Sequence, residues 1–109
     1  MLKDLVKNIY KHAENESPNE CCGLIIEKNK KMKYIKMKNL SNNKKDHFKM
    51  DDKLFTLFQF TEKILYVVHS HYNSNCNPSE HDINTCNALQ IPYLIVSYPN
   101  KDYKVVQPC

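Results

Sequence analysis

An apolar run that leads directly into two histidines is the feature that most constrains the fold of this chain. Residues 64–68, Ile-Leu-Tyr-Val-Val, lack polar alternation, which is typical of a strand buried on both faces. His69 and His71 follow at once. Side chains two positions apart on a strand point to the same side, with backbones roughly 6.5 to 7 Å apart. The run therefore predicts an interior strand whose end presents two imidazoles toward one point.

Seven residues separate the second histidine from a helix start that supplies a candidate third ligand. Ser79-x-x-Asp82 stands ahead of an apolar pattern and has the spacing of a helix cap. We expect Asp82 to join His69 and His71 around a metal ion, while Ser79 fixes the helix start. A capping box alone is the simpler alternative, and the two roles are compatible. Two histidines and one carboxylate leave the fourth position of tetrahedral zinc open, which is the arrangement of catalytic rather than structural zinc.

A catalytic metal site also needs a proton carrier, and Glu20 is the candidate. It stands at the mouth of a second apolar strand, in Glu20-Cys21-Cys22-Gly23. Gly23 is the only glycine of the chain, and a glycine inside a strand often marks a close approach of another group. A carboxylate near an activated water can act as a general base. Taken alone, Glu20 would more simply be a surface carboxylate before a strand.

Taken together, these residues resemble the JAMM motif of the MPN-plus metalloprotease family. The motif positions are Glu20 with Cys22-Gly23, His69-x-His71, and after seven residues Ser79-x-x-Asp82. The resemblance implies that zinc is bound by His69, His71 and Asp82. It further implies that Glu20 takes a proton from zinc-bound water and that Ser79 helps to hold the tetrahedral intermediate. The implied activity is that of a metallopeptidase or isopeptidase, and the implied fold is the cytidine-deaminase-like MPN fold.

Two further segments resemble the bacterial and phage branch of that family, especially the amino-terminal domain of phage tail assembly proteins. They are residues 77–82 and 91–97. This resemblance implies a protein or peptide substrate, such as a ubiquitin-like tail or a component of the phage tail or cell wall, and a role in tail assembly or cell entry. Tyr72 departs from the pattern, because many members have proline there. No cysteine-peptidase domain follows Cys109, so we expect a free-standing version or a fragment.

Two other classes of function remain open. Relatives that lack the ligands serve as non-catalytic assembly or scaffold modules, and a related bacterial repair-linked family suggests a role with DNA. The net charge of +4 comes entirely from lysine, without any arginine, and six lysines fall within residues 28–38. A solvated hairpin edge explains them better than a nucleic-acid surface, because lysine protects exposed strands and no arginine forks are present.

Length and composition predict one domain over residues 1–109, because 109 residues with 41% hydrophobic content can form one core. The sequence has no apolar stretch long enough to cross a membrane and no apolar run typical of a secretion signal. We therefore expect a cytoplasmic protein, or a virion-associated one if the source is a phage. The five cysteines lack paired spacing, which predicts free thiols. Cys76 follows the histidine pair, and we expect a loop thiol rather than a ligand.

Hydrophobic periodicity and turn residues predict the order helix, strand, strand, helix, strand, helix, strand, strand. This order predicts a mixed α/β fold with a central mixed sheet and helices on its faces. The expected segments are a helix over 2–13, strands over 21–27 and 32–40, a helix begun by Asp51 or Asp52, the strand of the histidine pair, a helix over 79–89, and strands over 93–98 and 103–106.

Overall fold

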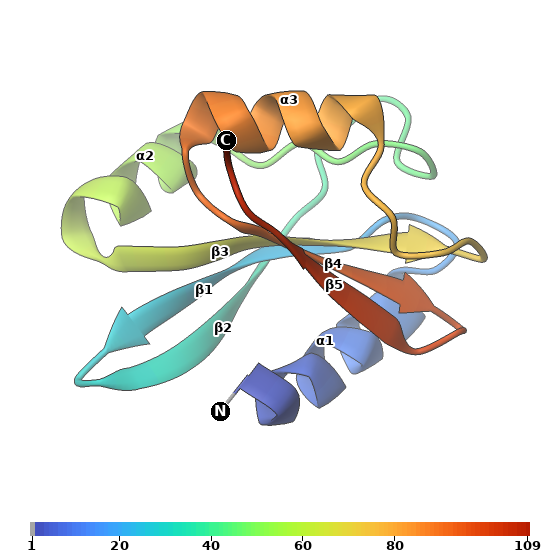
Figure 1. Ribbon diagram of the computed structural model, residues 1–109, viewed down its shortest axis with the longest axis horizontal. Helices are drawn as coiled ribbons and strands as arrows, with labels where there is room; N and C mark the ends of the chain where they lie inside the picture. Colours follow the sequence, from blue (N-terminus) through green and yellow to red (C-terminus); the bar gives the residue numbers. More distant parts are fainter. Residues whose placement is uncertain (1) are drawn as a thin grey trace.

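The elements follow the predicted order in a computed structural model that describes residues 2–109. The order of helices and strands is the expected one, and the α/β fold class is confirmed (Figure 1). The elements are α1 (Leu2–Glu16), β1 (Cys22–Lys28), β2 (Lys31–Met37), α2 (Asp52–Thr61), β3 (Lys63–Tyr72), α3 (Glu80–Leu89), β4 (Tyr93–Tyr98) and β5 (Asp102–Val106).

The five strands form one mixed sheet in the order β2-β1-β3-β4-β5. Only β3 and β4 pair in parallel, and α3 lies between them in the chain. A parallel pair requires such a crossover connection, whereas the antiparallel pairs β1–β2 and β4–β5 are joined by short turns. β3 thus occupies the middle of the sheet, which is the interior position that its apolar sequence predicts.

Helices cover the two faces of the sheet separately, with α1 on one side and α2 and α3 on the other (Figure 1). Val68 packs in the cluster beneath α1, and Val67 packs with residues of the α3 side. Side chains alternate along a strand, so His69, in phase with Val67, lies on the α3 face. The α1 cluster contains Val6, Ile9, Ile25, Val68, Leu94 and Val96, and the α3 cluster contains Cys22, Leu24, Ile26, Met37, Met50, Val67, Cys86 and Tyr93.

Gly23 lies where β2 approaches β1 too closely for any side chain. A Cβ atom at this position would come within 2.5 Å of both the backbone oxygen of Ile35 and the ring of Tyr34. The close approach expected of the single glycine is therefore present, and the approaching group is the neighbouring strand.

Two segments differ from the sequence-based expectation. β2 ends at Met37 rather than at Leu40, because Asn39 turns its side chain inward and binds the following loop. α2 begins at the cap residue Asp51 as expected, but Leu54 and Leu57 are exposed and the helix buries no residue completely. Within residues 2–109, no helix combines the length and apolar character needed to cross a membrane.

Candidate metal centre

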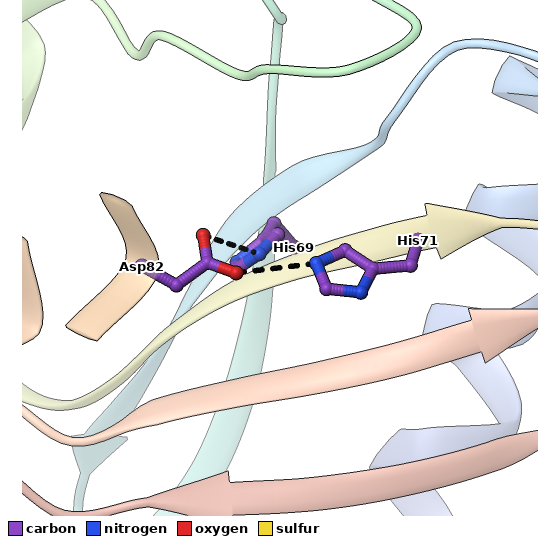
Figure 2. A group of neighbouring side chains, drawn as sticks. All are labelled: His69, His71 and Asp82. Carbon is purple, nitrogen blue, oxygen red and sulfur yellow. Dashed lines mark hydrogen bonds and ion pairs between the residues drawn. The ribbon is translucent and has the colours of Figure 1, made fainter. Parts of the chain in front are cut away.

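Three of the predicted site residues converge on the α3 face of the sheet. His69 and His71 project from β3, and Asp82 reaches toward them from the first turn of α3 (Figure 2). Nε2 of His69 lies 3.1 Å from Oδ1 of Asp82, and Nε2 of His71 lies 3.2 Å from Oδ2. One ligand atom from each residue lies within 4.8 Å of the others. The structure therefore brings together the three residues expected to bind the metal.

His69 is enclosed by aromatic rings and has no hydrogen-bonded ring nitrogen. Its exposed fraction is 0%. The ring of Phe48 stacks on it with centroids 4.5 Å apart, and the ring of Tyr93 meets it edge-on at 5.7 Å. Within residues 2–109, neither nitrogen of His69 has a hydrogen bond, since Asp82 is close to Nε2 but poorly aligned. Buried polar atoms without partners are rare in folded proteins, so a missing ligand is a direct explanation.

His71 is oriented by a loop carbonyl. Its Nδ1 lies 3.0 Å from the backbone oxygen of Asn75, which can only accept a hydrogen bond. In the neutral ring the proton is therefore assigned to Nδ1, which leaves the lone pair of Nε2 for a metal ion, whereas the hydrogen bond from Nε2 to Oδ2 of Asp82 requires the doubly protonated ring. Such a second contact fixes the ring and the tautomer of a metal-binding histidine.

Ser79 and Asp82 form the capping box that their spacing predicts. Oγ of Ser79 accepts a hydrogen bond from the backbone N–H of Asp82 at 3.1 Å, and Oδ2 of Asp82 accepts one from the N–H of Ser79 at 2.9 Å. The same carboxylate oxygen faces His71. The helix cap therefore also sets the direction in which Asp82 points.

The charges of the group are strongly coupled. Burial alone would raise the pKa of Asp82, but the adjacent ring nitrogens of His69 and His71 hold it well below its usual range. Burial lowers the pKa of His69 despite its carboxylate neighbour. Burial opposes protonation of His71 too, yet Asp82 and the carbonyl of Asn75 raise its pKa overall. The group thus holds a fixed negative charge beside two imidazoles, which is a donor set suited to a divalent cation.

The donor set is of a kind that binds zinc. Each histidine nitrogen lies beside a different oxygen of Asp82, at 3.1 and 3.2 Å, and one ligand atom from each residue lies within 4.8 Å of the others. Two imidazole nitrogens and one carboxylate oxygen are also a common donor set for catalytic zinc. Cys76 is a free, partly buried cysteine in the loop between β3 and α3, and the group found within residues 2–109 consists of His69, His71 and Asp82.

Glu20 lies just before β1 and is buried, with 5% of its surface exposed. It is not one of the grouped ligands, but the charges of His71 and Asp82 act on its carboxylate. Burial raises the pKa of Glu20 to about 8, and Asp82 also raises it while His71 opposes the change. A buried carboxyl beside a group of potential metal ligands is suited to proton transfer rather than to a solvated surface role.

Sequence patterns did not indicate two residues that shape this site. Phe48 lies between the expected strand over 32–40 and the expected helix cap, and Asn39 lies in the segment expected to be strand. Their contacts with His69 and with the backbone of Glu20 span about 20 positions of the chain, so no local periodicity reports them. The available signals were an aromatic residue inside a polar loop and an asparagine at the end of an alternating strand.

A sequence model of the prokaryotic homologs of the JAB domain matches residues 2–107. The chain belongs to this family. This chain is also 32% identical over 108 residues to tail tip assembly protein K of Escherichia phage N15. That alignment covers 99% of this chain and 44% of the relative, so the chain spans less than half of the relative's length. The resemblance predicted from the motif is confirmed, including its phage and bacterial branch.

Solved structures share the fold of this JAB protein. A protein from Desulfitobacterium hafniense is 26% identical with a TM-score of 0.68, over 96% of this chain and 77% of that one. A JAB1/MPN domain protein from Archaeoglobus fulgidus is 23% identical with a TM-score of 0.66, over 94% and 83%. A structure described as a metalloprotease-like zinc site in the proteasome and signalosome has a TM-score of 0.58 at 23% identity, over 94% and 81%. These likenesses establish a JAB/MPN-type fold.

Proposed function

We propose that this JAB protein is a zinc-dependent metallopeptidase or isopeptidase that hydrolyses an amide bond, with residues 1–109 acting as one catalytic domain. The observation that carries the proposal is the group of His69, His71 and Asp82, whose ligand atoms lie within 4.8 Å of one another. His69 adds support, because its buried ring nitrogens have no hydrogen bonds within residues 2–109. Zinc bound by these residues would supply a Lewis acid that activates water and polarises a carbonyl.

Glu20 is the proposed general base. Its carboxyl is buried, which raises its pKa to about 8, and it becomes the charged base only beside a bound cation because an opposite charge favours the ionised form. Glu20 can then take a proton from water and pass it to the leaving amine. The burial of this side chain excludes bulk water from the transfer.

Ser79 is the proposed donor to the oxyanion. Its Oγ accepts the N–H of Asp82, which leaves the hydroxyl proton free to be donated. Donors aimed at developing negative charge contribute strongly to amide hydrolysis. Ser79 would thus serve as helix cap and as catalytic donor at once, in keeping with its place beside Asp82.

The proposed substrate is a protein or peptide. Because the phage relative is a tail tip assembly protein, we place the reaction in tail assembly or cell entry, with the protein in the cytoplasm or associated with the virion. The substrate classes to compare are ubiquitin-like tails, tail proteins and cell-wall peptides. Zinc-loaded protein should cut a member of such a panel, and mass spectrometry of the products identifies the severed bond.

The Glu20→Gln variant is the control for this experiment. It should bind zinc as the wild type does and cut nothing, because the amide cannot carry the proton. Normal turnover by this variant would remove Glu20 from the mechanism. Absence of turnover by zinc-loaded wild type on every substrate would overturn the peptidase proposal.

A non-catalytic assembly module is the second candidate, favoured by the name of the phage relative, which describes tail tip assembly. This role needs no bound metal. Purified protein that contains no metal at neutral pH and gains no activity when zinc is added would support the assembly role over the enzyme.

A further inference from the structure

Asn39 forms an unusually dense set of hydrogen bonds for one buried side chain. Only 7% of its surface is exposed. Its Nδ2 donates to the backbone oxygens of Glu20 at 2.9 Å, His47 at 2.9 Å and Lys44 at 3.4 Å. Its Oδ1 accepts hydrogen bonds from the backbone N–H groups of Ser41 at 3.0 Å and Lys49 at 3.1 Å. An amide is the neutral side chain that can donate and accept in this way, so the position calls for asparagine specifically.

These bonds close the segment between β2 and α2 into a compact loop of residues 39–49. The two ends of this loop are also joined directly, because the N–H of Leu40 donates to the oxygen of Lys49 at 2.8 Å. Loops of this kind hold their shape through their own contacts and often carry function. Asn39 lies at the centre of the closure, since it binds the loop at its beginning, middle and end.

The closed loop contacts the candidate metal centre from two directions. On one side, the N–H of Glu20 donates to the oxygen of Lys44 at 2.7 Å, and the oxygen of Glu20 accepts from Asn39. On the other side, Phe48 stacks on the ring of His69. Both backbone polar groups of Glu20 are therefore held by the loop. Neither Glu20 nor Phe48 belongs to the segment that carries the three ligands.

We propose that Asn39 is a positioning residue, which fixes the backbone of Glu20 and the ring of Phe48 on two sides of the group formed by His69, His71 and Asp82. The proposal rests on the proposed function for its catalytic consequence. Within residues 2–109, the side-chain hydrogen bonds of Asn39 go to the loop and to Glu20, and none goes to His69, His71 or Asp82. Its loss should therefore disturb the proton carrier and leave the ligands in place.

The test compares Asn39→Ala with Asn43→Ala. Asn43 is a matched control, because it is an asparagine of the same loop, but its side chain is exposed and bonds only Asp46 at 3.3 Å. Amide hydrogen exchange of Glu20, followed by NMR in the zinc-loaded protein, reports the bond to Lys44. We expect exchange at Glu20 to accelerate by about tenfold or more in Asn39→Ala and by less than about twofold in Asn43→Ala. The exchange rates of the β3 amides serve as an internal control, because they stay slow only while the sheet is folded.

Turnover gives the second measurement. Per zinc-loaded molecule, Asn39→Ala should lose about tenfold or more in kcat with KM changed less than about threefold, because a misplaced base affects the chemical step more than substrate binding. Zinc content should remain that of the wild type. The Asn39→Asp variant retains the acceptor for Ser41 and Lys49 but loses every donor, so it tests the contact with Glu20 if the alanine variant does not fold.

Unchanged exchange at Glu20 in a folded Asn39 variant would overturn the proposal, even if that variant is less stable. Equal effects of the Asn39 and Asn43 substitutions would do the same. The exchange measurement does not depend on turnover. If wild-type protein cuts no substrate while exchange at Glu20 responds to Asn39 alone, the peptidase function fails and the positioning of Glu20 stands.

Discussion

Nε2 of His71 lies 3.2 Å from Oδ2 of Asp82, although the two residues belong to different elements, a central strand and the helix that follows it. Each partner is held independently. A loop carbonyl orients His71, and a capping box orients Asp82. Local structure therefore orients both side chains, which is the preorganisation that a metal centre requires.

Replacing the proposed ligands should abolish zinc binding. Alanine at His69, His71 or Asp82 removes one of three donors, and we expect zinc content to fall well below one ion per chain by elemental analysis. His81→Ala is the matched control, because His81 is an exposed neighbour of Asp82 outside the group of ligands. One zinc ion per chain in all three ligand variants would place the metal elsewhere.

The buried carboxyl of Glu20 should make the metal-free protein less stable at alkaline pH. Its pKa rises from an ordinary value of 4.5 to about 8 in the fold, so the folded state favours the protonated form. The stabilisation is complete below pH 4.5 and is lost as the pH rises toward about 8. At about 1.4 kcal/mol per pKa unit, the free energy of unfolding should fall by up to about 5 kcal/mol across this window.

Glu20→Gln removes that titration and serves as the comparison. Urea unfolding of the chelator-treated variant should show a much flatter dependence on pH between 4.5 and 8, with the variant more stable than wild type at pH 8. Parallel curves for the two proteins across the window would show that Glu20 has no raised pKa.

The Ser79 cap should contribute to zinc affinity beyond its effect on stability. Ser79→Ala removes the acceptor for the N–H of Asp82, and we expect the free energy of unfolding to fall by about 0.5 to 2 kcal/mol. Zinc affinity should also fall by about 10-fold to 100-fold, because the first turn of α3 loses the side-chain cap that holds Asp82 in place, even though the backbone N–H of Ser79 still donates to Oδ2.

Asp51→Ala supplies the control for Ser79. Asp51 caps α2 through the N–H groups of Lys53 and Leu54, remote in the chain from the ligands, so a similar loss of stability should leave zinc affinity unchanged. Isothermal titration with zinc separates the two cases. Equal zinc affinities in the two variants would contradict a directing role for Ser79.

Gly23→Ala should destabilise the protein without removing any polar contact. The added methyl group would meet the backbone oxygen of Ile35 and the ring of Tyr34 at 2.5 Å, so both strands must move apart. We expect a loss of about 1 to 3 kcal/mol in the free energy of unfolding, measured with urea. Since the backbone oxygen of Ile35 is part of the clash, Tyr34→Leu should rescue the loss only in part.

The order of elements and the family were predictable because both depend on local patterns. The apolar run before His69 predicted an interior strand, and the spacing of Ser79 and Asp82 predicted the helix cap. The three proposed ligands lie on one strand and on the first turn of the helix that follows it. The residues that the structure brings together are therefore already close in sequence. Their roles in zinc binding and catalysis stay predictions.

The features that sequence patterns did not predict depend on contacts between distant segments. Asn39 ends β2 early because its amide finds partners in Glu20 and the following loop, and no strand propensity reports that competition. α2 begins at its predicted cap, yet Leu54 and Leu57 are exposed, because periodicity shows only that a helix is apolar. It does not show how much of the sheet remains uncovered for that helix to pack on.

The placement of Glu20 and the ligands on separate parts of the chain has a consequence for how such a protein can change. His69, His71 and Asp82 lie within the continuous strand, loop and helix of residues 63–89, whereas Glu20 is secured by residues 39–49. In the proposed enzyme, substitutions in the first segment would act on the affinity for zinc. Substitutions in the second would act on proton transfer by Glu20, so one property could change while the other is retained.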